Sequence, residues 1–278
     1  MYTLQAYRKL PKEIKSIATK YYVSVACMRM NVSHHNHLYD FFELERSYNP
    51  QLPALPTSKG NFWTLKSGGE VIDRTHIIEA MDKYLPDLSM STLRHPIWQA
   101  FALKVDDTSS ASILLRLLNP ELSSKIFYEE AYSQRVQQNE ISKELIEHIS
   151  KHCSLDSAAA LLVFHDLYEE HADLVIELLI KTIITLSMCT PTDVIGFDLY
   201  ELMFERTGIL KKISSHQKKV RKTESFSSWI IFIKSKLNHM LGKEVYGFER
   251  AEIFTVLSSI NLEELNNYKN ESQTKQSV

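Results

Sequence analysis

Glycine is scarce in this sequence, with 7 residues among 278. Loops that cradle phosphate groups depend on closely spaced glycines, which let the backbone approach the phosphate in conformations that other residues avoid. The sequence holds no Gly-rich phosphate loop, no dinucleotide-binding fingerprint, no protein-kinase motif set and no G-x-S-x-G nucleophile motif. Their absence excludes the enzyme classes that are built on those motifs.

Cysteine is scarce as well, and its pattern bears on the compartment. Cys27, Cys153 and Cys189 are odd in number, widely separated and not part of any C-x-x-C pair, whereas secreted disulfide-rich domains carry dense, even sets. The N-terminal residues spread their charges and lack the apolar run of a secretory signal. We therefore expect a cytoplasmic protein whose cysteines are structural. Cys153 differs, because a preceding histidine and a following helix start can both lower a thiol pKa.

Neither sign of charge is in excess, since the formal net charge is −2. Hydrophobic residues make up 44% of the chain, which is typical of a globular protein. The small net charge argues against a dedicated polyanion binder but allows a local basic patch. Long uninterrupted apolar runs are also missing, because charged residues cut the most apolar stretch, so we predict no membrane span.

Glycine and proline are both absent between Glu121 and Thr190, which favours a long helical body. At its centre, Ser154–Met188 is apolar around most of a helix, so we expect other helices to surround it. Ser154 or Asp156 can cap its start, and the stretch forms either one rod or two helices broken near His171. Its charged residues recur at helical steps and predict a solvated stripe, formed by Asp166, Glu169, Glu170, Asp173, Glu177 and Lys181.

The segment 49–73 differs from the rest of the chain. Its prolines predict an extended connector, because each disfavours helix in the residue before it. Residues 61–65 and 70–72 then flank Lys66–Gly69, a pattern that predicts a β-hairpin. The predicted fold is mainly α, an irregular multi-helix bundle with one small β-hairpin near residues 61–73. We predict four segments: N-terminal helices 1–48, connector and hairpin 49–73, a main helical body 74–268 with a sub-boundary at 207–224, and a polar tail 269–278.

Apolar spacing also predicts individual helices. One covers His37–Arg46, with Leu38, Phe41, Phe42 and Leu44 as its apolar residues. A helix is expected over Ser89–Lys104, bent at Pro96, and another from Pro120 to Gln138, because proline suits the first helical turn.

Three histidines gather at the start of the helix predicted over His37–Arg46. His34, His37 and Asp40 could bind a transition metal through neutral imidazoles and a carboxylate, since His37 and Asp40 share a helical face. The H-E-x-x-H arrangement is absent. The plainer interpretation is a polar helix start that is rich in histidine.

Arg29 and His34, separated by four residues, resemble the Arg…His pair of the helical HEPN ribonucleases. The resemblance implies that Arg29 holds phosphate and that His34 acts in proton transfer. Met30 stands where that family often has asparagine, so the resemblance covers two residues only.

His165 and Asp166 resemble the adjacent His-Asp pair of the HD-type metal phosphohydrolases, in which the metal activates a water. The resemblance implies further ligands upstream and downstream, with His148 or His152 and Asp193 or Asp198 as the candidates. The segment between His152 and the pair is short for that family, and two adjacent side chains point about 100° apart on a helix. The plainer interpretation is that both belong to the margin of the solvated stripe.

A basic segment contains no acidic residue between Leu210 and Thr223; its charged residues are Lys211, Lys212, Lys218, Lys219, Arg221 and Lys222. Such a segment can bind phosphate backbones, a protein partner or a membrane surface. It can also rest on the acidic stretch 140–177, which holds nine acidic and two basic residues, within one molecule or across a dimer. A solvated or intramolecular role is the interpretation we favour.

No complete catalytic set emerges from these motifs. The leading hypothesis is a non-enzymatic cytoplasmic interaction protein, an adaptor or subunit of a larger assembly, with a protein partner or self-association. The alternatives are an enzyme acting on nucleic acid, either HEPN-like or an HD-like metal phosphohydrolase, and a nucleic-acid-binding protein that uses residues 211–222. We predict no cofactor, with a divalent metal at a histidine cluster as the alternative.

Overall fold

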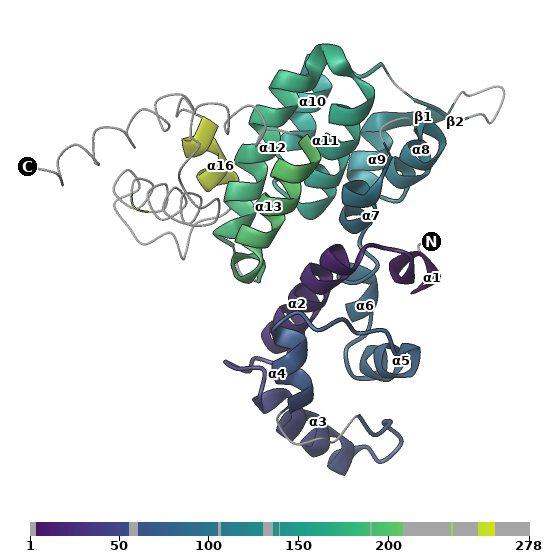
Figure 1. Cartoon of the computed structure of the whole chain (residues 1–278), viewed down its shortest axis with the longest axis vertical. Helices are drawn as coiled ribbons and strands as arrows, with labels where there is room; N and C mark the ends of the chain where they lie inside the picture. Colours follow the sequence, from purple (N-terminus) through teal and green to yellow (C-terminus); the bar gives the residue numbers. More distant parts are fainter. Residues whose placement is uncertain are drawn as a thin grey trace, which may run out of the picture. The chain divides into compact units, whose positions relative to one another are not determined.

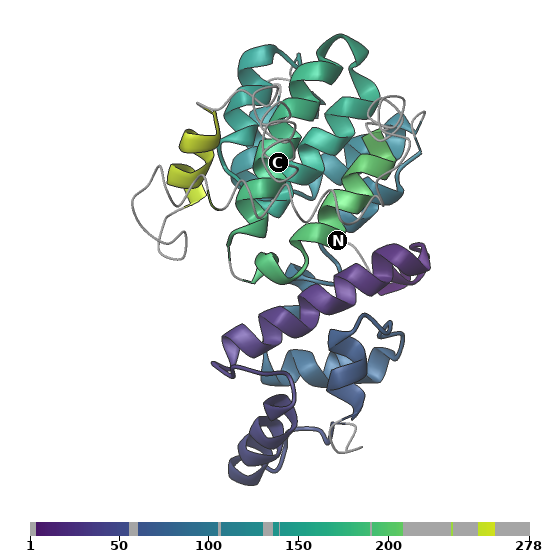
Figure 2. The ribbon, with the colours of Figure 1, turned by 60° about the vertical axis from the view of Figure 1, so that its left-hand side comes forward.

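A computed structural model describes residues 4–55, 61–104, 107–129, 136–138, 140–189, 191–207, 235 and 250–258. The described residues are mainly helical, as predicted, and the chain divides into two compact units, Met1–Pro120 and Glu121–Val278 (Figures 1 and 2). The predicted connector 49–73 lies within the first unit, while the tail 269–278 and nearly all of 207–224 fall outside the described residues. None of the described helices has both the length and the apolarity needed to cross a bilayer.

The first unit is built around its longest helix, α2. Its helices are α1 (Leu4–Arg8), α2 (Lys12–Arg29), α3 (His37–Tyr48), α4 (Asn61–Ser67), α5 (Thr75–Tyr84), α6 (Leu88–Ser91), α7 (Pro96–Ala102) and α8 (Thr108–Arg116). Helix α2 packs against α4, α6 and α7. It buries Ile14, Ala18, Tyr22 and Val25, which recur every three or four residues and so lie on one face.

Helix α3 is held to the first unit by one of its faces. Leu38 and Phe42 are buried, and the Phe42 ring lies 5.7 Å from the Trp63 ring and 5.0 Å from the Tyr84 ring, centroid to centroid. The Tyr84 hydroxyl donates a hydrogen bond of 2.6 Å to the carbonyl oxygen of Pro53. The Pro-rich connector is therefore tied to the aromatic cluster beneath α3.

Residues 61–73 do not form the predicted β-hairpin; that prediction is wrong. Asn61–Ser67 is helix α4, and the two glycines end it instead of forming a hairpin turn. The Glu70 N–H donates to the Leu65 carbonyl at 2.9 Å and the Gly69 N–H to the Lys66 carbonyl at 3.0 Å. With Gly69 at a φ of 94°, this is the Schellman arrangement that closes helix C-termini. Glycine pairs suit both kinds of turn, and the sequence pattern did not separate them.

The helix predicted over Ser89–Lys104 is two helices, because the first ends at Ser91 and the second begins at Pro96. Proline occupies the first helical position of α7, where its missing N–H costs no hydrogen bond. Trp98 is completely buried, and its indole N–H donates to the Thr92 carbonyl at 2.6 Å. This bond ties α7 to the segment between the two helices.

The second unit is built around an antiparallel helix pair. Its elements are α9 (Pro120–Ile126), which begins at the unit boundary, β1 (Phe127–Glu129), β2 (Val136–Gln138), α10 (Lys143–Ser150), α11 (Leu155–Leu167), the 3-10 helix η1 (Glu169–His171), α12 (Ala172–Ser187), the 3-10 helix η2 (Thr192–Val194), α13 (Gly196–Thr207) and α16 (Arg250–Ser258). Helices α11 and α12 pack on each other, and α10, α13 and α16 pack on α12.

The helix predicted to run from Pro120 to Gln138 ends at Ile126 instead. Phe127–Glu129 pairs antiparallel with Val136–Gln138, with Phe127 opposite Gln138. The aromatic Phe127-Tyr128 pair suits an extended backbone, which outweighs the helical reading of the sequence there.

The sequence of the central stretch, Ser154–Met188, allowed either one long helix or two helices with a break near His171. The structure has two helices. Ser154 caps α11 in a reciprocal capping box, because the Ser157 N–H donates to the Ser154 hydroxyl at 3.1 Å and the Ser154 N–H to the Ser157 hydroxyl at 2.8 Å. Every residue of 157–164 is buried, which confirms that α11 is surrounded by protein. Helix α12 begins after η1, at Ala172.

The predicted solvated stripe is wrong at two positions. The side chain of Asp166 is 3% exposed and bonded to Arg206, and that of Lys181 is 6% exposed and donates to Glu177 at 2.6 Å. A charge can be buried in this way when a partner of opposite charge compensates its lost hydration. The other four members of the stripe, Glu169, Glu170, Asp173 and Glu177, are exposed as expected.

Candidate functional site

The histidine cluster lies at the turn into α3. His34, His37 and Asp40 are exposed, with the His34 ring 3.9 Å from the His35 ring and 6.4 Å from the His37 ring. The His34 Nδ1 accepts a hydrogen bond of 3.3 Å from the Asn36 N–H. Anywhere in the described part of the chain, no three His, Cys, Asp or Glu side chains form a group that could hold a metal ion. This arrangement gives the metal hypothesis no support at His34, His37 and Asp40, nor at His165 and Asp166.

Arg29 makes hydrogen bonds to other parts of the first unit. Its guanidinium donates to the Pro86 carbonyl at 2.7 Å and to the Ser91 hydroxyl at 3.2 Å, which joins the end of α2 to the surroundings of α6. Among the described residues no interaction links Arg29 to His34. The hydrogen bonds of Arg29 and His34 thus go to other groups, and the role that the resemblance to the HEPN ribonucleases implies for the pair stays a prediction.

His165, Asp166 and Arg206 form a compact cluster where α11 and α13 end. The His165 Nδ1 lies 3.1 Å from an Asp166 carboxylate oxygen, and the other carboxylate oxygen accepts a hydrogen bond from the Arg206 guanidinium. The adjacent His and Asp side chains thus meet despite their angular separation on the helix. A carboxylate behind an imidazole is the arrangement that orients a general base. Here Arg206 also neutralises that carboxylate, and the cluster fastens α11 to α13.

Sequence reasoning missed Arg206 as a member of this cluster. It lies 40 residues beyond Asp166, and nothing in its local pattern marks it as a partner. Its Nε is buried without a hydrogen-bond partner among the described residues. The guanidinium therefore depends on Asp166 for its compensation. The other implied ligands, His148 and His152, lie on and just after α10, with their rings 5.5 Å apart and next to each other.

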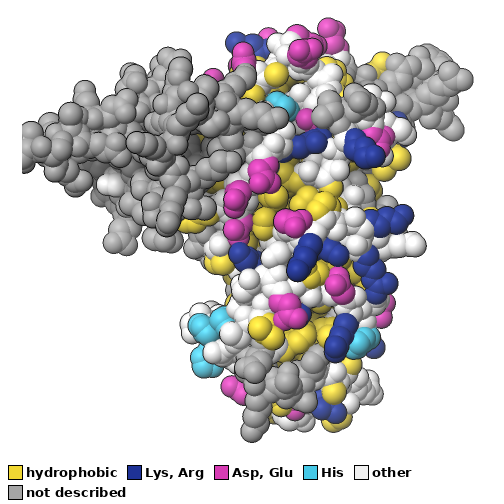
Figure 3. Space-filling model, viewed as in Figure 1, with side chains coloured by type: hydrophobic (Ala, Val, Ile, Leu, Met, Phe, Trp, Pro, Cys, Tyr) yellow, Lys and Arg dark blue, Asp and Glu magenta, His cyan; other side chains and the backbone are white. Residues whose placement is uncertain are grey.

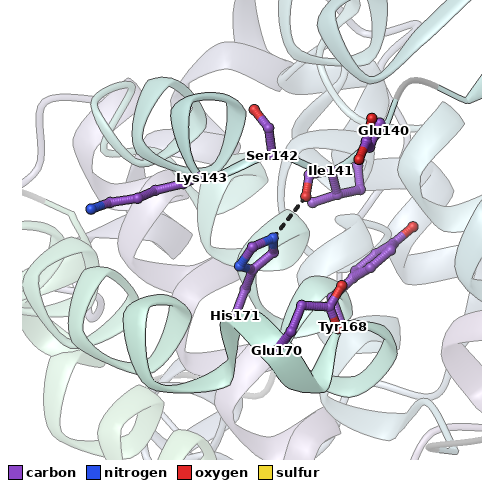
Figure 4. A pocket seen from close by; sticks show the side chains of 7 residues that line it. All are labelled: Glu140, Ile141, Ser142, Lys143, Tyr168, Glu170 and His171. Carbon is purple, nitrogen blue, oxygen red and sulfur yellow. Dashed lines mark hydrogen bonds between the residues drawn. The ribbon is translucent and has the colours of Figure 1, made fainter.

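An open depression of about 760 Å³ lies between the start of α10 and η1 (Figure 4). It is lined by Glu140, Ile141, Ser142, Lys143, Tyr168, Glu170 and His171. The His171 Nε2 lies 3.0 Å from the Ile141 carbonyl oxygen, so in the neutral ring it carries the proton and donates it. The His171 imidazole therefore joins η1 to the segment that precedes α10. Figure 4 shows the Lys143 side chain pointing away from this imidazole.

Part of the acidic stretch 140–177 is open to solvent, and so are two acidic residues of α13 that lie outside that stretch. Asp173 and Glu177 on α12 and Glu201 and Glu205 on α13 are exposed, and Figure 3 shows acidic side chains gathered where these helices lie. Such a surface repels a phosphate backbone. The basic segment Lys211–Lys222 lies outside the described residues, so its predicted contact with this surface, or with nucleic acid, stays a prediction.

Cys153 departs from what the sequence suggested. Its side chain is completely buried before α11, and burial raises the pKa of its thiol to about 12. Loss of hydration, the largest cause, outweighs the lowering of the pKa by the charge of Arg250 and by the hydrogen bond with Thr185.

Helix α3 carries the most exposed large apolar side chain of the described residues. Tyr48 is 79% exposed and Leu44 51% exposed, and Phe41 is half-buried. Together with His37 they follow one another at steps of four, three and four residues, which places them on one side of the helix. We call these four residues the α3 seam. It lies beside the face by which Leu38 and Phe42 hold the helix to its unit.

Acidic residues border the α3 seam on both sides. Asp40 precedes Phe41 by one position and Glu45 follows Leu44 by one, which are the positions that flank the contact line of a helix pair. Arg46, which follows Glu45 in the sequence, lies 3.9 Å from Glu43 on another side of the helix. The seam is therefore a line of one histidine and three apolar or aromatic side chains with acidic borders.

The chain matches no model of a known protein family, no curated protein and no solved structure.

His35, within the histidine cluster, provides a pH-dependent prediction. Its Nε2 is buried without a partner among the described residues, and loss of hydration and then the charge of His34 hold the pKa of His35 below its usual 6.5. Because the folded-state pKa is depressed, this contribution to stability is present above pH 6.5 and is lost as the pH falls through the folded-state value. We expect the urea midpoint of the first unit to fall between pH 7 and pH 5, and to fall less in His35→Gln.

The control for this prediction is His76→Gln, which removes an exposed histidine from α5 of the same unit. That variant should keep the pH dependence of the parent chain. An equal pH dependence in His35→Gln and the parent would refute the assignment to His35.

Proposed function

We propose that this chain is a non-enzymatic cytoplasmic interaction protein, an adaptor or subunit of a larger assembly, that binds an α-helix of a protein partner along the α3 seam. The proposal rests on the exposure of Leu44 and Tyr48, at 51% and 79%, on a helix whose neighbouring face is already buried. A large apolar side chain that becomes fully buried on binding contributes about 1.5–3 kcal/mol. Two such side chains therefore provide a substantial part of the free energy of a specific complex.

The spacing of the α3 seam supports a helix as the partner element. Steps of four, three and four residues match the contact line by which two helices pack side by side, each side chain entering a gap between four residues of the other helix. Hydrophobic grooves that bind a helix contact its apolar side chains at the same spacing. An extended peptide would instead follow a period of two, which the seam does not have.

The acidic borders of the seam decide between a second copy of this chain and a different protein. If two α3 helices paired, Asp40 and Glu45 would meet acidic residues in both the parallel and the antiparallel orientation. Like charges across such an interface reduce the affinity of the wrong partner. The partner that fits is a helix with an apolar line bordered by lysine or arginine.

A model peptide can test this pairing without knowledge of the natural partner. Two fluorescein-labelled helical peptides carry the same leucine line, one bordered by lysines and the other by glutamates. In fluorescence anisotropy titrations with the full chain, we expect the lysine-bordered peptide to bind at least ~10-fold more tightly. The double variant Leu44→Ser/Tyr48→Ser should weaken that binding by roughly 100-fold.

The matched control for this titration is Ile113→Ser. Ile113 is 55% exposed on α8, so the control removes a comparable exposed side chain away from the seam. It should bind the lysine-bordered peptide as the parent chain does. Equal affinity of the seam variant and this control would rule out the α3 seam as the binding surface.

One observation favours an enzyme as a second candidate. The imidazole of His165 is held by the buried carboxylate of Asp166 and its side chain remains 17% exposed, as a general base requires. This would suit a phosphoester-hydrolysing activity, in line with the resemblance to the HD-type hydrolases. Against it, Arg206 already binds the carboxylate that a metal would need. His165→Gln separates the two candidates. It should abolish a phosphoester-hydrolysing activity that uses His165 as general base, and it should leave peptide binding at α3 unchanged.

A further inference from the structure

Cys153 and Cys189 lie at the same end of the α11–α12 hairpin. Cys153 immediately precedes Ser154, the cap of α11, and Cys189 follows the end of α12 at Ser187. The two helices pack along each other and are joined by η1, whose last residue, His171, is equally far along the chain from both cysteines. An antiparallel pair of nearly equal arms brings the beginning of one helix beside the end of the other.

The surroundings of Cys153 place it against the last turn of α12. Its thiol donates to the Ser150 carbonyl at 3.4 Å and also interacts with the Thr185 hydroxyl, which lies one helical turn before Cys189. The Cys189 thiol is itself near enough to raise the pKa of Cys153. Cys153 and Cys189 therefore lie at the same end of the α11–α12 pair, on segments far apart in sequence.

The backbone at Cys153 is strained. Its φ is 44°, in the left-handed region, where the other non-glycine residues of the described chain are Asn31 and Asp87. Asparagine and aspartate tolerate this region because their side chains can bond to the local backbone, whereas cysteine gains no such help. Backbone strain of this kind often occurs at residues that have a functional role.

We propose that Cys153 and Cys189 form a reversible disulfide when the protein meets hydrogen peroxide. Cys189, the partly exposed member, reacts first: its thiolate attacks one peroxide oxygen, the O–O bond breaks, and the leaving hydroxide takes a proton and becomes water. Cys153 then attacks the sulfenic sulfur, loses its proton, and displaces the hydroxyl group as a second water. Two thiols are oxidised to one disulfide, and one peroxide is reduced to two waters.

The buried state of Cys153 fixes this order. A thiol with a pKa of about 12 is hardly ever a thiolate at neutral pH, so Cys153 does not react with peroxide itself. It acts once the sulfur of Cys189 has become electrophilic beside it. The disulfide closes the loop from Cys153 to Cys189 and ties the open end of the helix pair, which restricts the unfolded chain.

Cys27 is the internal control. It lies on α2 in the first unit and is half-buried, and burial raises the pKa of its thiol to about 11. The other two cysteines of the chain belong to the second unit, so Cys27 has no cysteine of its own unit to pair with.

Peptide mapping of the full chain tests the proposal. The protein is treated with a small excess of hydrogen peroxide, its remaining thiols are alkylated, and it is digested with trypsin without reductant. Because trypsin cuts after Lys151, Lys181 and Arg206, the disulfide joins two separate peptides, 152–181 and 182–206. We expect this linked pair, released by dithiothreitol, with Cys27 alkylated, and a melting temperature about 5 °C or more higher than in the reduced protein.

Single variants make the result decisive even if one of them folds poorly. Cys27→Ser should still form the linked pair, and Cys153→Ser should leave a sulfenic acid on Cys189 that dimedone traps. Recovery of Cys153 and Cys189 as separate alkylated peptides would overturn the proposal. Accumulation of sulfinic acid on Cys189 in the parent chain, or links that involve Cys27 as often, would overturn it as well.

Discussion

Asp166→Ala should lower the free energy of unfolding of the second unit by about 3 kcal/mol, because it leaves the Arg206 guanidinium buried and uncompensated. The Asp166 side chain is 3% exposed and that of Arg206 is 16% exposed, and the Arg206 Nε has no other partner among the described residues. Breaking one side of a buried ion pair costs more than the pair contributes, since the remaining charge has lost its hydration. Urea denaturation followed by circular dichroism measures the change.

Two further variants identify the cause of that loss. His165→Gln removes the imidazole but keeps the ion pair, so it should cost less than about 1 kcal/mol. The double variant Asp166→Leu/Arg206→Met replaces both charges with apolar groups and should recover most of the loss. A double variant that is as unstable as Asp166→Ala would show that the charge balance is not the reason.

Gly196→Ala should destabilise the second unit by about 2–3 kcal/mol. A Cβ atom at Gly196, the first residue of α13, would lie 2.8 Å from the Cα atom of Ser187 and would also overlap its side chain. Because the Cα atom belongs to the backbone of α12, no rotamer change can relieve the contact, and α13 must shift away. The same denaturation measurement detects the loss.

The double variant Ser187→Gly/Gly196→Ala tests the contact directly. Removing the Ser187 side chain relieves one of the overlaps and leaves the backbone contact, so we expect part of the stability to return. No recovery at all would mean that the loss arises elsewhere than at the crossing of α12 and α13.

Much of the helical framework follows from local chemistry that the sequence displays. Pro11 precedes α2, Asp107 caps α8 by accepting from the Ser110 N–H at 2.9 Å, and Ser154 caps α11. Each of these depends on residues within three or four positions, so the sequence contains all the information needed. The buried girth of α11 was also predictable, because a long apolar stretch without glycine or proline has few alternatives.

The wrong predictions concern positions whose structure depends on residues that are distant in sequence. Gly68-Gly69 can turn a hairpin or end a helix, and packing of α4 on α2 selects the helix. Asp166 was predicted to be solvated because the charged residues nearest to it in the sequence are acidic, while its partner, Arg206, lies on α13. The α3 seam could be predicted only in part. The sequence placed Phe41 and Leu44 among the apolar residues of the helix, but only the structure separates them from the buried Leu38 and Phe42.

The measurement that most directly tests the central claim is photo-crosslinking from the α3 seam in the cells that produce this protein. Tyr48 is replaced by p-benzoylphenylalanine, and Ser47, exposed on another side of the same helix, provides the control position. We expect an adduct from position 48 that is much weaker from position 47 and is lost with Leu44→Ser, its linked peptide an amphipathic helix bordered by lysine or arginine. Equal adducts from both positions, or a linked peptide of this chain's own α3, would contradict the claim.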